Sequence, residues 1–172
     1  MRKVTYGVGC SLDGFIARSD ETVDWLQWSK DVERISSAFW RTLDTVLMGR
    51  RTYEVAVAAG TRSYPGVRSL VFSRTLRPED FPEVEIHAGD AVEHVEQLKN
   101  SAGRGVAVMG GGRLASSLLN KGLIDEIGVN VHPILLGSGI PFLSGLRREI
   151  ALELKHTESL SHGCIYLLYA VR

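Results

Sequence analysis

Three consecutive glycines, Gly110 to Gly112, follow the apolar run Val106–Met109 and precede a helical pattern at Arg113–Lys121. Glycine has no Cβ, so an anion can approach its backbone closely, and the free N–H groups of a helix start attract phosphate. With Ala115 the glycines also satisfy the loose dinucleotide pattern G-x-G-x-x-A, although a Rossmann domain carries that pattern in its first strand–helix turn. A tight structural turn is the alternative. Three glycines directly after a strand favour phosphate binding.

Two further strand ends carry groups that bind phosphate. The first is Gly49-Arg50-Arg51-Thr52, and the second is Ser73-Arg74 after the run Ser69–Phe72. Arginine makes bidentate, charge-assisted bonds to phosphate, so this set suits the 2′-phosphate that distinguishes NADPH from NADH. A solvated basic helix start is the alternative for Arg50 and Arg51 alone. Because ligands of α/β proteins bind at the carboxyl ends of the strands, the convergence of three such ends predicts a dinucleotide site.

The first long loop places Asp24 beside Trp25. A carboxylate next to an aromatic ring can hydrogen-bond to and stack on a flat heterocycle. The alternative is that Trp25 and Trp28 plug the end of the sheet while Asp24 caps a turn, and the sequence leaves both open. No HxxxH or HExxH spacing, no G-x-S-x-G and no G-x-x-x-x-G-K-[ST] is present, so neither a metal site nor a hydrolase is expected.

Hydrophobic periodicity predicts the elements that position these groups. Helices are expected at Ser29–Leu43, Thr52–Ala59, from Asp90 onward and at Arg113–Lys121. Strands are expected at Val4–Cys10, Thr45–Met48, Ser69–Phe72, Val84–His87, Gly105–Met109, Ile127–Leu136, Ala151–Thr157 and Cys164–Val171. Alternating strands and helices predict an α/β fold with a mostly parallel sheet, and the last strands, joined by the turn Ser161–Gly163, add an antiparallel hairpin.

The composition fits one domain over residues 1–172. Apolar residues make up 44% and charged residues 23%, and 20 basic residues balance 20 acidic ones. A net charge of zero gives no general attraction to nucleic acid or an anionic membrane. Cys10 and Cys164 are expected to be buried free thiols. The chain shows neither a signal-peptide core nor a membrane span, which predicts a cytoplasmic protein.

The order of motifs along the chain resembles the dihydrofolate reductase-like superfamily, most closely the C-terminal reductase domain of bifunctional riboflavin-biosynthesis proteins. The resemblance covers nearly the whole chain. Its motifs are S-L-D-G-F-I-A and V-D-W-L, then V-L-M-G-R-R-T-Y-E, L-V-F-S-R, V-M-G-G-G-R-L and D-E-I-G-V-N-V-H-P-I-L-L-G-S-G. It implies a three-layer αβα fold. The deaminase motifs H-x-E and P-C-x-x-C are absent, so the chain is expected to be a stand-alone reductase.

The resemblance also implies NADPH as cofactor and assigns residues to it. Ile16 and Ala17 lie by the nicotinamide, and Phe72 lies near the adenine. The phosphates and the 2′-phosphate are assigned to Gly49, Arg50, Arg51, Thr52, Ser73 and Arg74. The pyrophosphate is assigned to Gly110, Gly111, Gly112, Arg113 and Leu114, with a cis peptide expected within the first two of these glycines.

The sequence indicates fewer residues for binding the substrate than for binding the cofactor. Asp24 is the best candidate for the catalytic proton donor, and Asp24 with Trp25 for substrate binding. Folate is disfavoured because Lys30 stands where its reductases carry an acid. The expected reaction is hydride transfer from NADPH to a heterocycle, as in reduction of 5-amino-6-(5-phosphoribosylamino)uracil. The alternatives are a folate or other carbonyl or imine reductase and a non-catalytic NADP(H)-binding module. A homodimer is expected through an apolar C-terminal hairpin that contains Ile165, Leu167, Leu168 and Tyr169.

Overall fold

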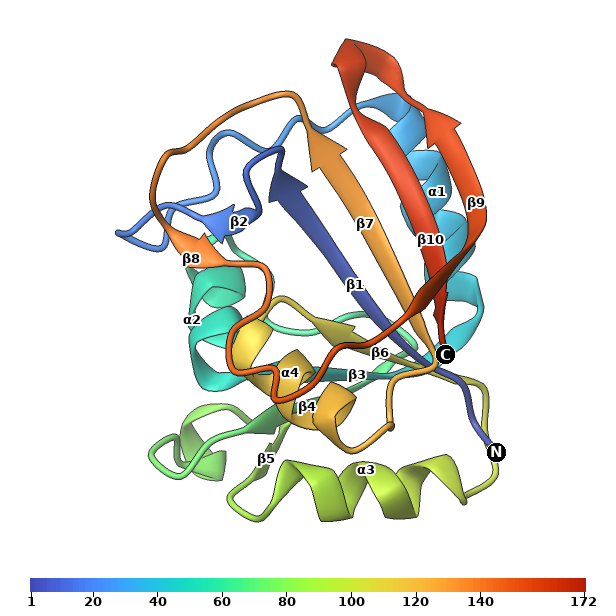
Figure 1. Ribbon diagram of the computed structural model, residues 1–172. Coiled ribbons are helices and arrows are strands. Elements are labelled where there is room, and N and C mark those ends of the chain that lie inside the picture. The colour runs from blue at the N-terminus through green and yellow to red at the C-terminus, as the bar shows by residue number, and fades with distance from the viewer.

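The computed structural model describes residues 1–172 and is built on one twisted, eight-stranded sheet (Figure 1). The strand order is β5-β4-β3-β6-β1-β7-β10-β9. The six strands of the parallel part are β1 (Val4–Ser11), β3 (Leu43–Gly49), β4 (Arg68–Phe72), β5 (Glu85–His87), β6 (Gly105–Met109) and β7 (Glu126–His132). Strand β10 (Ile165–Val171) runs antiparallel to both β7 and β9 (Leu152–Ser159).

Four helices and some short elements connect the strands. The helices are α1 (Lys30–Arg41), α2 (Arg50–Ala58), α3 (Ala91–Lys99) and α4 (Gly112–Asn120), and two 3₁₀ turns span Pro78–Asp80 and Ser161–Gly163. A second, two-stranded sheet pairs β2 (Phe15–Ala17) with β8 (Ile140–Pro141). No helix is long and apolar enough to cross a membrane.

Each face of the sheet is covered, because the strands alternate apolar side chains between two cores. On one face Val4, Val106 and Val108 pack in a cluster with Leu118 of α4 and Val95 of α3. On the other face a smaller cluster gathers apolar residues of β3, β4 and β6 around α2: Leu43, Val46, Met48, Tyr53, Val71, Val84 and Ala107. The result is the predicted three-layer αβα arrangement with its antiparallel C-terminal hairpin.

Helix α1 differs from the other three α-helices because none of its residues is fully buried. Ser29 caps it, and its side chain accepts the Val32 N–H. The spacing of Val32, Ile35 and Phe39 predicts an inward face, which is confirmed, but Ala38 from the same pattern is exposed. The inward face of α1 stands off the sheet and lines a cavity.

The sequence pattern missed β2 and β8, which are only three and two residues long. Cys10 and Cys164 are buried free thiols, as predicted. The predicted C-terminal hairpin is confirmed, and the homodimer expected through it stays a prediction. Strand β10 is hydrogen-bonded on both sides, by β7 and β9, so a two-fold partner cannot pair with it edge to edge. The free edge belongs to β9.

One buried ion pair ties the amino ends of the strands together. The Arg2 guanidinium, 6% exposed, pairs with the Asp44 carboxylate and donates to Thr45 Oγ1 at 2.9 Å and to the Arg104 carbonyl at 2.8 Å. Asp44 also accepts the Arg104 N–H at 2.7 Å. Because a lone guanidinium is costly to bury, these bonds depend on one another.

Replacing Asp44 with alanine leaves the Arg2 guanidinium buried without a counter-ion. We expect Asp44→Ala to lower the free energy of unfolding by about 2–3 kcal/mol. The control Glu96→Ala removes an exposed carboxylate that makes no ion pair, and we expect a change within about 0.5 kcal/mol. Urea denaturation measures both. Equal stabilities of the two variants would contradict the role given to this pair.

Candidate functional site

Four neighbouring strands end at the same edge of the sheet. In the order β4, β3, β6 and β1, their carboxyl ends lead into Ser73-Arg74, the start of α2, the glycines 110–112 and the loop that becomes β2. The strands are parallel and in register, with Gly49 opposite Phe72 and Met48 opposite Met109. The three phosphate-binding segments predicted from the sequence are therefore adjacent.

The glycine turn touches the start of α2. A Cβ on Gly110 would lie 2.8 Å from Thr52 Cγ2, and one on Gly112 would lie 2.5 Å from the Phe142 carbonyl oxygen. Gly110 and Gly111 adopt left-handed φ values of 54° and 52°. The expectation of a cis peptide within the first two glycines is wrong, because every peptide bond is trans. Two successive left-handed residues make the turn instead.

Both helices that begin at this edge lack a side-chain cap. The N-caps are Gly49 for α2 and Gly111 for α4, and neither has a side chain that could accept a hydrogen bond from the first-turn N–H groups. By contrast, Ser29 caps α1 and Asp90 caps α3 through side-chain oxygens. Uncapped first-turn N–H groups need an acceptor, and an anion supplies one. The two uncapped helices are the two that meet at the glycine turn.

Guanidinium groups surround these helix starts. Arg74 and Arg113 are exposed and take part in no ion pair or side-chain hydrogen bond, whereas Arg50 pairs with Glu54 at 2.9 Å and Arg51 with Glu21 at 3.5 Å. Ser73 behaves differently from its neighbours. It is buried, and its hydroxyl accepts the N–H groups of Thr75 and Leu76, so it shapes the turn that presents Arg74.

Aromatic rings border the outer strand ends. Phe72 meets the rings of His87 and His94 edge-on, at centroid distances of 5.5 and 5.9 Å. The two imidazoles lie 4.5 Å apart, and burial together with His87 lowers the pKa of His94. Phe72 thus stands in an aromatic group on β4, β5 and α3 that sequence reasoning did not identify.

The segment 139–142 links β2 to the glycine turn. A Cβ on Gly139 would lie 2.2 Å from the Ala17 carbonyl oxygen, and Phe142 closes against Gly112. Asp13 anchors the loop before β2: it accepts the Ser11 hydroxyl at 2.6 Å and the Gly137 N–H at 2.7 Å, and these bonds lower its pKa. The motifs S-L-D-G-F-I-A and L-L-G-S-G are thereby joined, and the segment 139–142 lies between β2, which contains Ile16 and Ala17, and Gly112 of the glycine turn.

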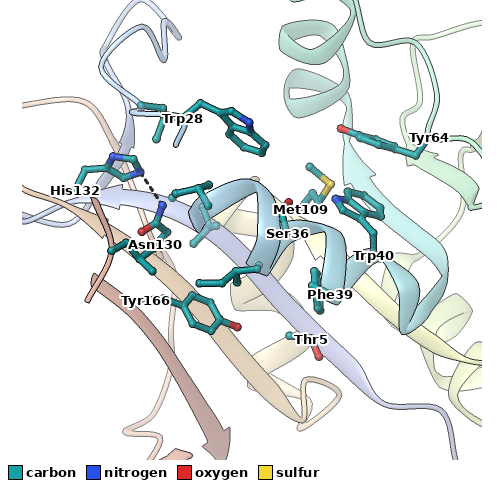
Figure 2. A pocket seen from close by; sticks show the side chains of 18 of the residues that line it. Thr5, Trp28, Ser36, Phe39, Trp40, Tyr64, Met109, Asn130, His132 and Tyr166 are labelled. Carbon is teal, nitrogen blue, oxygen red and sulfur yellow. Dashed lines mark hydrogen bonds between the residues drawn. The ribbon is translucent and has the colours of Figure 1, made fainter. Parts of the chain in front are cut away.

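A cavity of about 480 Å³ lies between α1 and the sheet (Figure 2). It exists because three positions on the facing strands have no side chain, namely Gly7 and Gly9 of β1 and Gly128 of β7. A Cβ on Gly9 would lie 2.8 Å from Leu26 Cδ2, and one on Gly128 would lie 3.2 Å from the Tyr166 hydroxyl. Met109, which immediately precedes the glycine turn, also lines the cavity.

A buried imidazole forms one wall of this cavity. His132 is 2% exposed, and burial lowers its pKa, so the ring is neutral near pH 7. Its Nδ1 accepts the Gln27 N–H at 3.2 Å, which leaves the proton on Nε2. Nε2 lies 3.2 Å from Asn130 Nδ2 (Figure 2), whereas Asn130 Oδ1 has no hydrogen-bond partner. A protonated Nε2 and an amide N–H are both donors, so exchanging the oxygen and nitrogen of this amide would satisfy both groups.

Asp24 and Trp25, the predicted substrate-binding pair, point apart. Trp25 is 7% exposed and meets His132 edge-on at 5.5 Å, whereas the Asp24 side chain is 71% exposed and pairs with Arg18 at 3.0 Å. Neither residue lines the cavity; Leu26 and Trp28 do. The structure gives Asp24 no contact through which it would reach a ligand there.

Sequence reasoning missed the residues that line the cavity. Three signals could have found some of them. The first two are glycine at alternate positions of β1 and the alternation Gly128, Asn130, His132 in β7, because residues two apart in a strand lie on one face. A serine within the apolar stripe of α1, Ser36, is a third. Tyr64 and Tyr166 come from distant parts of the chain and carry no local signal.

The strand order, the glycine turn and the cavity under α1 define a dihydrofolate reductase-like α/β protein. The family model for the RibD C-terminal domain matches residues 2–166, and the chain belongs to this family.

Individual relatives agree with this assignment. YwjB of Bacillus subtilis is 33% identical over 164 residues, covering 94% of each chain. The crystal structure of a putative riboflavin biosynthesis protein from Shewanella sp. PV-4 superposes with a TM-score of 0.84 at 24% identity, covering 99% of each chain. A deaminase/5-amino-6-(5-phosphoribosylamino)uracil reductase from Thermotoga maritima gives 0.72 at 16% identity, with 99% of this chain on 57% of that one. The two structures show a shared fold.

The neutral state of His132 predicts a pH-dependent stability. The unfolded chain protonates an imidazole near pH 6.5, whereas burial holds the pKa of His132 below that value in the fold. The contribution of His132 to the free energy of unfolding is therefore complete above the pKa of the imidazole in the unfolded chain. It is lost as the pH falls from that value toward the lower pKa of His132 in the fold.

The variant His132→Gln removes this titration. We expect its stability to fall less than that of the wild type between about pH 7.5 and about pH 5.5, measured by urea denaturation. His94, whose pKa is also lowered, contributes to both proteins. An identical pH dependence for both would contradict a buried, neutral His132.

Proposed function

We propose that the protein is a reductase that transfers a hydride from NADPH to a C=N or C=O group of a heterocyclic substrate. The RibD C-terminal domain is an oxidoreductase domain, which supports the reaction class. The observation that carries the proposal is the pair of uncapped helix starts meeting at the glycine turn, beside exposed arginines.

The residues at the edge fit the cofactor. Gly111 to Leu114 and Arg50 to Thr52 would hold the phosphates through backbone N–H groups, since no side chain competes for them. Arg74 and Arg113 have free guanidinium groups for further anionic oxygens. The adenine would lie by Phe72 and the nicotinamide by Ile16 and Ala17. Bound there, NADPH supplies the hydride.

The chain's contribution to the chemistry is positioning. Met109 joins the glycine turn to the cavity, so a cofactor held at the edge would face an acceptor under α1. Orientation of this kind lowers a barrier by roughly 7–11 kcal/mol. We assign no proton transfer to Asp24, because it is exposed and paired with Arg18.

The family resemblance implies 5-amino-6-(5-phosphoribosylamino)uracil as acceptor. We extend the proposal to a heterocyclic ring of this kind and not to its ribose phosphate, because no cationic side chain lines the cavity. Loss of reduced-nicotinamide absorbance on mixing the protein with NADPH and candidate acceptors tests turnover. NADPH-dependent thermal stabilisation without oxidation by any acceptor would instead indicate a binding module.

Arg74 tests the preference for NADPH. If its guanidinium binds the 2′-phosphate, Arg74→Ala weakens NADPH binding about tenfold and leaves NADH binding unchanged. Arg77→Ala is the matched control, since Arg77 is exposed in the same segment but pairs with Asp80 at 3.0 Å. Titration calorimetry with both cofactors measures the effect. Equal losses for NADPH and NADH on Arg74→Ala would refute this assignment.

A further inference from the structure

We propose that the cavity under α1 selects an uncharged, planar carbonyl or imine compound and rejects anionic ones, phosphate esters included. The inference rests on the proposed reductase function and narrows its substrate class. It departs from the phosphorylated acceptor that the family resemblance implies. The proposal is based on the charge and shape of the side chains that line the cavity.

No lysine, arginine, aspartate or glutamate lines the cavity. An anion placed there would lose its hydration without gaining a counter-ion, which is unfavourable in an apolar site. Of the two cations at the start of α1, Arg34 pairs with Glu158, and Lys30 is exposed and does not line the cavity. Asp31, which accepts the Ser161 N–H at 3.1 Å, and Glu33 are carboxylates and would repel a phosphate.

The walls are aromatic and flat. Trp40 stacks on Tyr64 with ring centroids 4.6 Å apart and an interplanar angle of 19°, and Phe39 lies beside them. Trp28 is 68% exposed and stands across the opening from this pair (Figure 2). Such walls favour a planar ring that stacks on them.

A few neutral polar groups remain to orient that ring. The hydroxyls of Thr5, Ser36 and Tyr166 line the cavity without a hydrogen-bond partner in the protein. Burial raises the pKa of Tyr166, which keeps its hydroxyl protonated and able to donate. An apolar cavity with a few neutral donors is suited to an uncharged carbonyl.

The reaction balances without another reagent. The carbonyl carbon would accept a hydride, with its electron pair, from the nicotinamide of bound NADPH, which would be oxidised to NADP⁺. The π electrons of the C=O bond move to the oxygen, which takes one proton from solvent. The product is an alcohol, and an imine would give an amine in the same way.

Two probe compounds that differ mainly in charge test how the charge of the ligand affects its binding. Isatin-5-sulfonamide and isatin-5-sulfonate share a planar dicarbonyl ring and a substituent of similar size, but only the second is an anion. By titration calorimetry we expect the sulfonamide to bind about tenfold or more tightly than the sulfonate. We expect no binding of 5-amino-6-(5-phosphoribosylamino)uracil. Equal binding of the isatin pair, or binding of the phosphorylated pyrimidine, would overturn the proposal.

Adjacent serines on α1 provide the variants. Ser36 lines the cavity, whereas Ser37 is exposed and does not. Ser36→Arg places a cation in the cavity, so we expect it to abolish or reverse the preference for the sulfonamide, and Ser37→Arg to keep it. The same preference in both variants would show that the sulfonamide binds elsewhere and would contradict the proposal.

NADPH titration, run separately on the same samples, distinguishes a failure of the proposed ligand class of the cavity from a failure of the proposed reductase function. NADPH binding without any isatin-5-sulfonamide binding overturns the cavity's proposed ligand class and leaves the cofactor proposal intact. Selective sulfonamide binding without NADPH binding overturns the reductase function while supporting the ligand class.

Discussion

The close approach of backbone at the Gly110–Gly112 turn is the constraint on which the site depends. Thr52 on one side and the Phe142 carbonyl on the other occupy the space that a Cβ would need. The turn therefore brings the starts of α2 and α4 together, and both helices begin at glycines that leave their first N–H groups uncapped. In the proposed function, two uncapped helix starts at one sheet edge would together bind an anion that neither helix would hold alone.

Glycine acts differently in the neighbouring cavity. At the edge its absent side chain lets backbone segments touch, whereas on the inner face of β1 and β7 it leaves room beneath α1. Helix α1 is consequently the α-helix in which no residue is fully buried. The neutral pair His132 and Asn130 forms part of the wall without bringing a charge. The edge proposed to bind phosphate and the cavity without charged side chains meet at Met109, so a charged cofactor and an uncharged acceptor would lie side by side.

Much of the fold was predictable from the sequence, and so was the sheet edge that we propose binds the cofactor, because both depend on local patterns. Hydrophobic runs gave the eight main strands, and the carboxyl-end rule brought Arg50, Arg74 and Gly110 to one edge. The cavity was not predictable in this way. Tyr64 and Tyr166 reach it from segments far apart in the chain. Asp24 illustrates the limit: beside Trp25 in sequence, it turns outward to Arg18 while the indole turns in toward His132.

In the proposed function, backbone N–H groups at two helix starts bind the phosphates of NADPH. Isotope-labelled protein can be titrated with NADPH while the backbone amide resonances are recorded. We expect saturable shifts that are largest at residues 50–52 and 111–114. Saturable binding that leaves these amides unshifted while moving others, or no saturable binding at all, would contradict this mode of binding.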